Sequence, residues 1–194
     1  MIPFIILRHG PTDWNEDRRL QGRADRPLSA AGRRAVARWS LPGALHTWRW
    51  HSSPLARARE TAALLGLNAS LDEALTEMDW GEWEGHRLSA LRQALGKEMA
   101  ENEDRGLDFR PPGGETPREA LNRLRPFLAR LAASGEPAGA VAHRGIIRAL
   151  YCHASGWDLR GKPPVKLASA CFHRFRIHPG GAAEIEALNL PLDP

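Results

Sequence analysis

Near its start the chain reads Ile2-Pro3-Phe4-Ile5-Ile6-Leu7-Arg8-His9-Gly10, an apolar run that ends abruptly in two basic side chains and a glycine. A short continuous apolar run is typical of a strand that is covered on both faces. Small residues at 138–142 form a second such run, and it ends similarly, in His143-Arg144-Gly145. We therefore expect two strands of a parallel sheet to deliver histidine and arginine to one edge, where ligands bind in open α/β sheets.

Helical and strand patterns alternate along the rest of the chain, which indicates an α/β fold. Residues 48–51 read as a strand, and Ser53 with Pro54 predicts the start of the helix that follows. Two alternating segments at 170–177 and 183–188 predict a closing hairpin. We expect a three-layer α/β/α sandwich, with a mostly parallel central sheet and an antiparallel edge.

Residues 88–114 interrupt this alternation. One helix is predicted for residues 88–99, a polar stretch follows, and Pro111-Pro112-Gly113-Gly114 breaks the chain before a capping box at Thr116 starts the next helix. We expect the interrupting segment to form a small cap over the sheet. No repeat or change of composition divides the chain, so residues 1–194 are predicted to form a single domain.

The composition is that of a folded protein with a basic charge balance. Of the 194 residues, 42% are hydrophobic and 26% are charged, and the net charge is +4. These values argue against disorder and collagen-like repetition. All but three of the 27 basic residues are arginines, spread along the chain among 23 acidic residues without a basic block. This distribution favours a small anion over nucleic acid as the partner. No apolar run approaches the roughly 20 residues that span a bilayer, so no membrane partner is expected.

Cysteines and metal-binding motifs are sparse. Cys152 and Cys171 do not form a CxxC pair, and we interpret them as buried thiols in a reducing cytoplasm, with a structural disulfide as the minor alternative. The apolar start lacks a basic leader, so we expect no secretory signal and a cytoplasmic location. The sequence contains no HExxH motif, clustered cysteines or acidic metal box, and we expect neither a metal nor another cofactor.

The residues at the predicted sheet edge fit phosphoryl chemistry. A third strand delivers Arg57 and Arg59 into the next helix, where a cation in the first turn opposes the helix dipole unless an anion is bound. Arg57 would join Arg8 and the two histidines, His9 and His143, because guanidinium groups grip phosphate oxygens through bidentate hydrogen bonds. An imidazole fixed through one nitrogen can attack phosphorus through the other, and a carboxylic acid would protonate the departing oxygen. Each residue alone has an ordinary structural explanation, so the prediction rests on their convergence.

Six short motifs follow one another along the chain. They read, in order, Leu7-Arg8-His9-Gly10-Pro11-Thr12-Asp13-Trp14-Asn15; Gln21-Gly22 with Asp25-Arg26-Pro27-Leu28-Ser29; Ser52-Ser53-Pro54-Leu55-Ala56-Arg57-Ala58-Arg59-Glu60-Thr61-Ala62; Glu77-Met78-Asp79-Trp80-Gly81-Glu82-Trp83-Glu84-Gly85; Pro112-Gly113-Gly114-Glu115-Thr116; and Val141-Ala142-His143. In this order they resemble the histidine phosphatase superfamily, in its phosphoglycerate-mutase-like branch. The resemblance covers essentially the whole chain.

Carried over residue by residue, the resemblance implies roles for the basic side chains. His9 would be the nucleophile that becomes phosphohistidine. Arg8, Arg57 and His143 would surround the transferred phosphoryl group. One residue departs from the family pattern, since the position after the second histidine is usually small and here is Arg144. If Arg144 points inward, it would favour substrates that carry a second negative charge.

The resemblance also implies roles for polar and acidic residues. Asn15 would add a neutral donor to the phosphate, and Gln21 with Gly22 would lie where the rest of the substrate passes. Alignment of the acid loop favours Glu77 as the proton donor, with Glu82 as the alternative, and the other two carboxylates of the loop would orient it.

The leading hypothesis is a metal-independent phosphomonoesterase of the histidine acid phosphatase type, acting on a small phosphorylated metabolite. A cofactor-dependent phosphoglycerate mutase is the alternative within the family; such mutases resemble one another in a longer insertion after the acid loop, whereas residues 85–111 are short here. A non-catalytic phosphate-binding module is the third hypothesis, and the intact His9, Glu77 and His143 argue against it. Sugar phosphates, phosphoglycerates, nucleotide-like phosphates and α-ribazole phosphate all remain candidate substrates, the last because α-ribazole phosphatases share this size and these motifs. The oligomeric state is left open.

Overall fold

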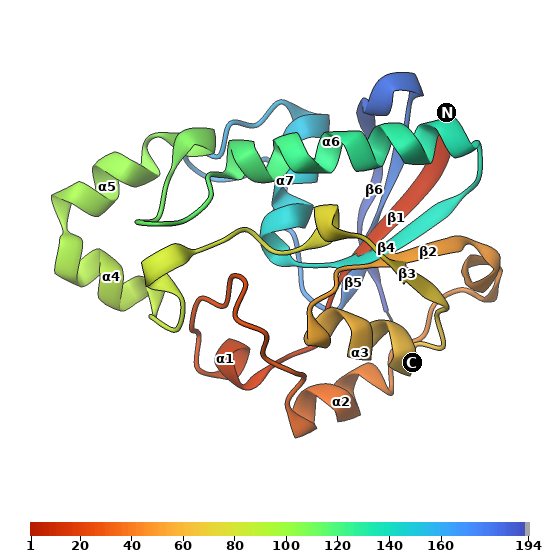
Figure 1. The fold of residues 1–194 in the computed structure, drawn as a ribbon, viewed down its shortest axis with the longest axis horizontal. Coiled ribbons are helices and arrows are strands. Elements are labelled where there is room, and N and C mark those ends of the chain that lie inside the picture. Colours follow the sequence, from red (N-terminus) through yellow and green to blue (C-terminus); the bar gives the residue numbers. More distant parts are fainter. Residues whose placement is uncertain (193–194) are drawn as a thin grey trace.

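A computed structural model describes residues 1–192, and a six-stranded sheet lies at its centre (Figure 1). The strand order is β3-β2-β4-β1-β5-β6, in which β1, β2, β3 and β4 are parallel and β5 runs antiparallel to both of its neighbours, β1 and β6. The mostly parallel sheet with an antiparallel edge is therefore confirmed. The strands are β1 Ile2–Arg8, β2 Arg49–Ser52, β3 Ala69–Leu71, β4 Ala138–Ala142, β5 Cys171–Ile177 and β6 Ala183–Pro191.

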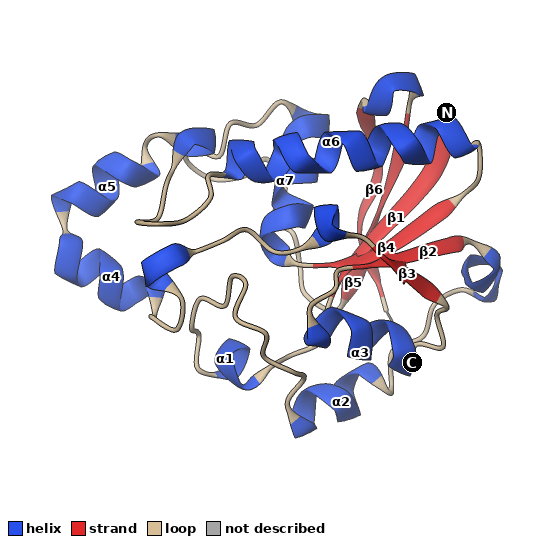
Figure 2. Cartoon of the chain, in the orientation of Figure 1, coloured by secondary structure: helices blue, strands red, loops and turns tan. Residues whose placement is uncertain are grey.

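Helices cover both faces of the sheet, which makes three layers (Figure 2). The side chains of β1 alternate between two apolar clusters: Phe4 and Ile6 pack toward α6 and α7, and Ile5 and Leu7 pack toward α2 and α3. The α-helices are α1 Asp13–Glu16, α2 Ala30–Val36, α3 Ala56–Leu64, α4 Leu88–Leu95, α5 Lys97–Glu103, α6 Pro117–Ser134 and α7 Arg144–Ser155. Short 3-10 turns lie at Gly43–Thr47, Glu73–Leu75, Gly81–Trp83, Gly106–Asp108 and Pro179–Gly181.

One predicted cap is present and another is absent. The capping box at Thr116 begins α6, because the Thr116 hydroxyl accepts a hydrogen bond from the backbone of Glu119 at 3.1 Å. The prediction that Ser53 caps the helix after β2 is wrong. That helix begins at Ala56 with Leu55 as its N-cap; the Ser53 hydroxyl accepts from the backbone N–H of Leu55 at 3.3 Å and contacts the ring of His143, described below.

Two further elements differ from the prediction. The single helix predicted for residues 88–99 is wrong, since Gly96 adopts φ 50 and separates α4 from α5; this positive φ is a conformation that glycine adopts readily and a helix interior cannot accommodate. The strand β3 was not predicted, because its three residues carry no apolar run and are partly exposed at the edge of the sheet.

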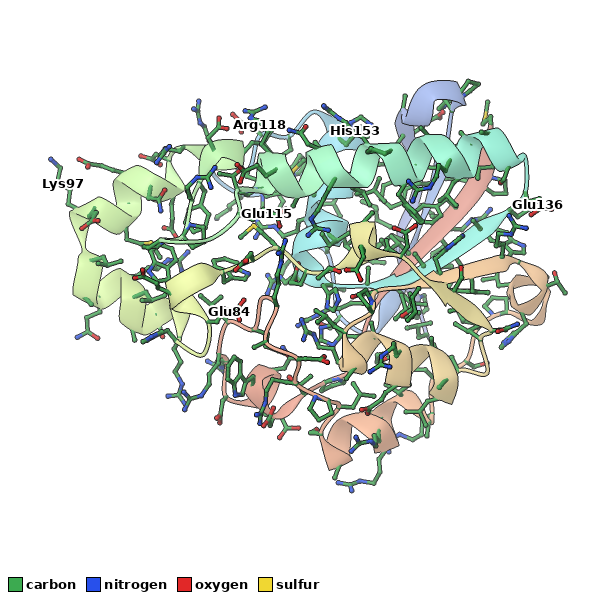
Figure 3. The ribbon with its side chains drawn as sticks, in the orientation of Figure 1. Glu84, Lys97, Glu115, Arg118, Glu136 and His153 are labelled. Atoms are coloured by element: carbon green, nitrogen blue, oxygen red, sulfur yellow. The ribbon has the colours of Figure 1, made fainter. Side chains whose placement is uncertain are left out.

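The carboxyl ends of the parallel strands face the end of the molecule that carries α4 and α5. Figure 3 shows Glu136, which precedes β4, and Lys97, which begins α5, at opposite ends of the molecule. Glu84 and Glu115 lie between them. None of the helices within residues 1–192 is long and apolar enough to cross a membrane.

Candidate active site

His9 follows the last residue of β1 and is held by its backbone to the neighbouring strand. Its backbone N–H donates to the carbonyl of Ala142, the last residue of β4, at 3.0 Å. Its ring Nδ1 lies 2.7 Å from the carbonyl oxygen of Gly10. Because a carbonyl only accepts, Nδ1 carries the proton, and Nε2 of the neutral ring is left with its lone pair. The backbone N–H of Gly10 donates in turn to the Thr61 hydroxyl of α3 at 2.9 Å, which fixes the loop.

His143 lies at the end of β4, next to His9. The two imidazole centroids are 5.0 Å apart, because β1 and β4 are adjacent parallel strands that end together. Nε of Arg57 donates to Nδ1 of His143 at 3.2 Å, so Nε2 carries the ring proton and lies 2.7 Å from the Ser53 hydroxyl. Both ring nitrogens therefore have protein partners, and a direct contact between His143 and a phosphoryl group requires one of these bonds to open.

Arg57 is fully buried in the first turn of α3 and joins three segments of the chain. Besides the bond to His143, its Nη1 donates to the carbonyl of Ala24 at 2.9 Å and its Nη2 to the carbonyl of Gly22 at 2.8 Å. A guanidinium has five N–H donors, so two remain for an anion.

Burial and positive charge keep the two histidines neutral. Desolvation lowers the pKa of His9 well below its usual value, and the charges of Arg8 and Arg57 lower it further. The pKa of His143 is lowered in the same way, by burial first and then by Arg57 and its other neighbours. A neutral imidazole beside two cations can act as a nucleophile toward an anionic ester that the cations attract.

Arg8, the last residue of β1, lies beside these rings with an unsatisfied donor. Its Nε is buried and has no hydrogen-bond partner among the described residues. Burial lowers the pKa of Arg8 to about 10, although the nearby negative charge of Glu77 acts to raise it. Leaving a buried charged donor without a partner costs roughly 1–3 kcal/mol or more. A bound anion would satisfy this donor.

Glu77 is buried close to the arginines and is held by two backbone groups. Its Oε1 accepts from the N–H of Met78 at 2.9 Å, and its Oε2 accepts from the N–H of Gly145, in the first turn of α7, at 3.0 Å. A side chain at position 145 would overlap the Glu77 carboxylate. The glycine therefore allows the acid to approach the helix end.

Two residues that the sequence analysis did not assign brace the acid loop. Nη2 of Arg123, on α6, donates to the carbonyl of Thr76 at 2.5 Å and to that of Glu77 at 3.1 Å. The Glu115 carboxylate accepts from Nε of Arg123 at 2.8 Å and from the backbone N–H of Asp79 at 3.3 Å. Glu115 lies inside one of the six motifs, so the sequence offers a signal for it. Arg123 lies in none of them, and only the packing of α6 against the loop identifies it.

Of the predicted polar residues, Gly22 lies in the segment that Arg57 holds, Gln21 precedes it, and Asn15 lies on α1. Gly22 adopts φ 54, and a side chain there would overlap the Glu84 carboxylate. That carboxylate accepts from the backbone N–H groups of residues 23 and 24 at 2.6 and 2.9 Å, so it orients the segment. Gln21 is buried and its Oε1 has no partner among the described residues. Oδ1 of Asn15 accepts from the backbone N–H of Thr12 at 3.2 Å and helps to cap α1.

Three charged residues named in the sequence analysis are exposed. Arg59 lies on the outer side of α3, and Glu82 lies on the 3-10 turn within the acid loop. The structure therefore places Glu77, rather than Glu82, beside the arginines. Arg144 is exposed at the start of α7, yet it lines a pocket together with Arg8. Residues 1–192 hold no group of three or more His, Cys, Asp or Glu side chains that could bind a metal ion.

The order of these residues along the chain matches a known family. A model of the histidine phosphatase superfamily (branch 1) matches residues 4–191. The chain belongs to this superfamily. The site described above is thus the candidate active site of a histidine phosphatase superfamily member, and the expected family assignment is confirmed.

Relatives of this superfamily member include phosphatases and a mutase. The chain is 36% identical over 207 residues to the glucosyl-3-phosphoglycerate phosphatase of Mycobacterium tuberculosis, covering 98% of this chain and 92% of the relative. It is 31% identical over 134 residues to a probable phosphoglycerate mutase of Salmonella paratyphi C, covering 66% and 62% of the two chains. The solved structure of mycobacterial glucosyl-3-phosphoglycerate phosphatase with inorganic phosphate has a TM-score of 0.79 to this chain at 28% identity, covering 99% of each.

Proposed function

We propose that this chain is a metal-independent phosphomonoesterase that hydrolyses a small phosphorylated metabolite through a phosphohistidine on His9. One observation carries the proposal: the bond from Nδ1 of His9 to the Gly10 carbonyl leaves Nε2 free, in a buried setting beside Arg8, whose buried Nε has no partner among the described residues. The names of the phosphatase relatives support the same reaction class.

In the first step the ester's phosphoryl group binds to the free N–H groups of Arg8 and Arg57. Nε2 of His9 attacks phosphorus, an N–P bond forms, and the bond from phosphorus to the ester oxygen breaks. The guanidinium groups balance the charge on the phosphoryl oxygens without a metal. The proton of a protonated Glu77 passes to the departing oxygen, and an alcohol leaves.

In the second step a water molecule attacks phosphorus from the side that the alcohol has left. Glu77, now a carboxylate, takes the proton of this water, the N–P bond breaks, and inorganic phosphate and neutral His9 are released. Each Glu77 oxygen accepts a single backbone hydrogen bond, so a lone pair remains for the transferred proton. His143 fixes Arg57 and adds a polar ring beside the nucleophile.

Residues 88–114 act in this proposal as a small cap on a single catalytic domain formed by residues 1–194. A groove of about 370 Å³ lies between this segment and α7. It is lined by Trp80 and Phe109 and by the arginines Arg92 and Arg148. Gly145, whose N–H holds Glu77, also lines it, so the groove is a path for the leaving group.

Trapping the intermediate tests the proposal. Wild-type protein mixed with a labelled phosphomonoester and quenched rapidly should carry phosphate that is labile in acid and stable in alkali, and His9→Ala should carry none. Wild type should also release inorganic phosphate from p-nitrophenyl phosphate. Label recovered on serine or aspartate, or equal turnover by His9→Ala, would overturn the mechanism.

The mutase alternative has the support of one relative's name. Incubation with 3-phosphoglycerate and a bisphosphorylated primer separates the two reactions. Release of inorganic phosphate supports the phosphatase, and formation of 2-phosphoglycerate without phosphate release supports the mutase. A panel of phosphomonoesters that includes phosphoglycerates, sugar phosphates and α-ribazole phosphate then ranks the substrates.

A further inference from the structure

A second pocket adjoins the candidate active site and is positively charged. Its volume is about 460 Å³, and Arg8 is common to it and to the site around His9. Arg144 and Lys166 bring two further cations, while apolar side chains such as Ile147 and Leu167 form the rest of its wall together with Ser169 and His173. No aspartate or glutamate lines this pocket within the described part of the chain.

The two added cations lack anionic partners among the residues that the structure describes. Neither Arg144 nor Lys166 takes part in an ion pair among residues 1–192. Arg144 is the first residue of α7, and the first turn of this helix contains no acid. A cation at this position opposes the helix dipole, and the negative charge at this helix end is the Glu77 carboxylate, which accepts from the N–H of Gly145. The charge of Arg144 also lowers the pKa of Arg8, after burial as the main cause, so the two guanidinium groups are close enough to repel each other.

The segment that carries Lys166 is fixed by the closing hairpin. Asn189 donates from Nδ2 to the carbonyl of Lys166 at 3.1 Å and accepts at Oδ1 from the N–H of Ala168 at 2.7 Å. Asn189 itself adopts φ 58, and its backbone N–H donates to Nδ1 of the buried His173 at 3.1 Å. The part of the pocket wall that carries Lys166 is therefore held by defined hydrogen bonds.

We propose that this pocket binds a second anionic group of the substrate, so that the chain prefers phosphomonoesters that carry a carboxylate or another phosphate near the ester. This proposal rests on the proposed function and names its substrate class. The phosphoryl group lies between Arg8 and Arg57, and the second anion lies on the other side of Arg8, between Arg144 and Lys166. Arg144 and Lys166 are specificity-determining residues in this arrangement, whereas the bond-breaking steps stay with His9 and Glu77.

A matched pair of substrates tests this assignment. 3-Phosphoglycerate and glycerol 3-phosphate differ in one group, a carboxylate in place of a hydroxymethyl. The wild type should have a higher kcat/KM for the carboxylate, and Arg144→Gln and Lys166→Gln should each lower the ratio of the two kcat/KM values, by about tenfold for the arginine, as expected for one charge-assisted contact. Arg34→Gln is the control, because it removes one charge from an exposed position on α2, and it should leave the ratio unchanged.

A second arm identifies the anion. Fructose 1,6-bisphosphate is compared with fructose 6-phosphate in the same variants. If the variants lower the kcat/KM ratio only for the pair 3-phosphoglycerate and glycerol 3-phosphate, the pocket binds a carboxylate. If they lower it only for the two fructose phosphates, the pocket binds a phosphate. Equal ratios in the wild type and both variants in both arms would overturn the proposal.

Failure of the proposed function gives a different result. If the wild type hydrolyses neither these esters nor p-nitrophenyl phosphate, the phosphatase proposal fails, and calorimetry with 2-phosphoglycolate and ethyl phosphate tests the pocket alone. Tighter binding of 2-phosphoglycolate that is lost in Arg144→Gln would support the second anion site. Equal binding of the two ligands would overturn it.

Discussion

Glu77 Oε2 accepts a hydrogen bond from the backbone N–H of Gly145 at 3.0 Å, two residues after His143. The start of α7 therefore fixes the acid and the second histidine together, although Glu77 is brought in by a loop from a distant part of the chain. The positive end of the helix dipole also faces the carboxylate. In the proposed mechanism, this contact gives position 145 a role beyond the start of a helix.

Gly145→Ala should displace Glu77, because the added methyl group would overlap the carboxylate. We expect kcat for an alkyl phosphate to fall by about 100-fold, the low end of what a positioned general acid contributes. The free energy of unfolding should change by less than roughly 1 kcal/mol, because alanine favours the helix. Gly43→Ala is the control, since nothing lies within 4 Å of its added methyl group. Full alkyl phosphate activity of Gly145→Ala would show that the acid does not depend on this contact.

Glu77→Gln and Glu82→Gln should differ in their dependence on the leaving group. Glu77→Gln should lower phosphoenzyme formation from an alkyl phosphate by roughly 100-fold or more, and much less from p-nitrophenyl phosphate, whose leaving group needs little protonation. Glu82→Gln should resemble the wild type, because its side chain is exposed. Rapid-quench measurement of phosphoenzyme separates this step from dephosphorylation. If only Glu82→Gln shows the dependence, Glu82 is the donor.

Ser53→Ala should impair the site through His143. The substitution removes the acceptor of the Nε2 proton of a buried imidazole, which should cost about 1–3 kcal/mol of unfolding free energy and lower kcat. Ser52→Ala is a matched control, since Ser52 is also buried and its hydroxyl donates to a backbone carbonyl at 3.0 Å. Urea unfolding and kcat on p-nitrophenyl phosphate should show similar stability losses but a larger loss of activity for Ser53→Ala. Equal kcat values in the two variants would contradict the proposed link.

Acid should destabilise the fold through buried histidines. Burial lowers the pKa of His173 to about 4, so below about pH 6.5 the unfolded chain binds a proton that the folded chain does not. The contribution of His173 to the unfolding free energy is thus fully present above this pH. It is lost as the pH drops toward 4, which lowers the unfolding free energy by roughly 3 kcal/mol. The drop in unfolding free energy between pH 7.5 and pH 4 should be smaller by about that amount in His173→Gln. An identical drop in both proteins would show that His173 is not the titrating group.

Metal chelation should leave the activity intact. Arginines supply the positive charge that metal ions provide elsewhere, so hydrolysis of p-nitrophenyl phosphate should be equal with and without excess EDTA. Vanadate, which mimics five-coordinate phosphorus, should inhibit. Loss of activity in EDTA and its recovery with zinc or magnesium would reverse this expectation.

The sequence predicts those parts of the fold and site that depend on local patterns. The apolar runs of β1 and β4 and the polar residues that follow them are visible in the sequence, and parallel pairing then brings His9 and His143 together. The break between α4 and α5 also had a local signal in Gly96, whose positive φ is unfavourable inside a helix.

Other contacts depend on packing between distant segments. The bond between His143 and Ser53 joins residues 90 positions apart, and Arg123 reaches the carbonyl of Glu77 from 46 positions away. A serine before a proline reads as a helix cap, and an arginine on a helix reads as a surface residue, until the tertiary structure brings their partners close.

The pairing of β1 with β4 has a consequence for synthesis on the ribosome. β1 is made first, but the strands that flank it in the sheet are β4 and β5, which emerge only after residues 138 and 171. During most of translation its Ile5, Ile6 and Leu7 have no partner strand, and such long-range pairing slows folding and exposes nascent chains to aggregation. A ribosome-bound chain that ends before residue 138 should therefore lack phosphate binding, since the second histidine and the helix end that holds the acid have not yet been made.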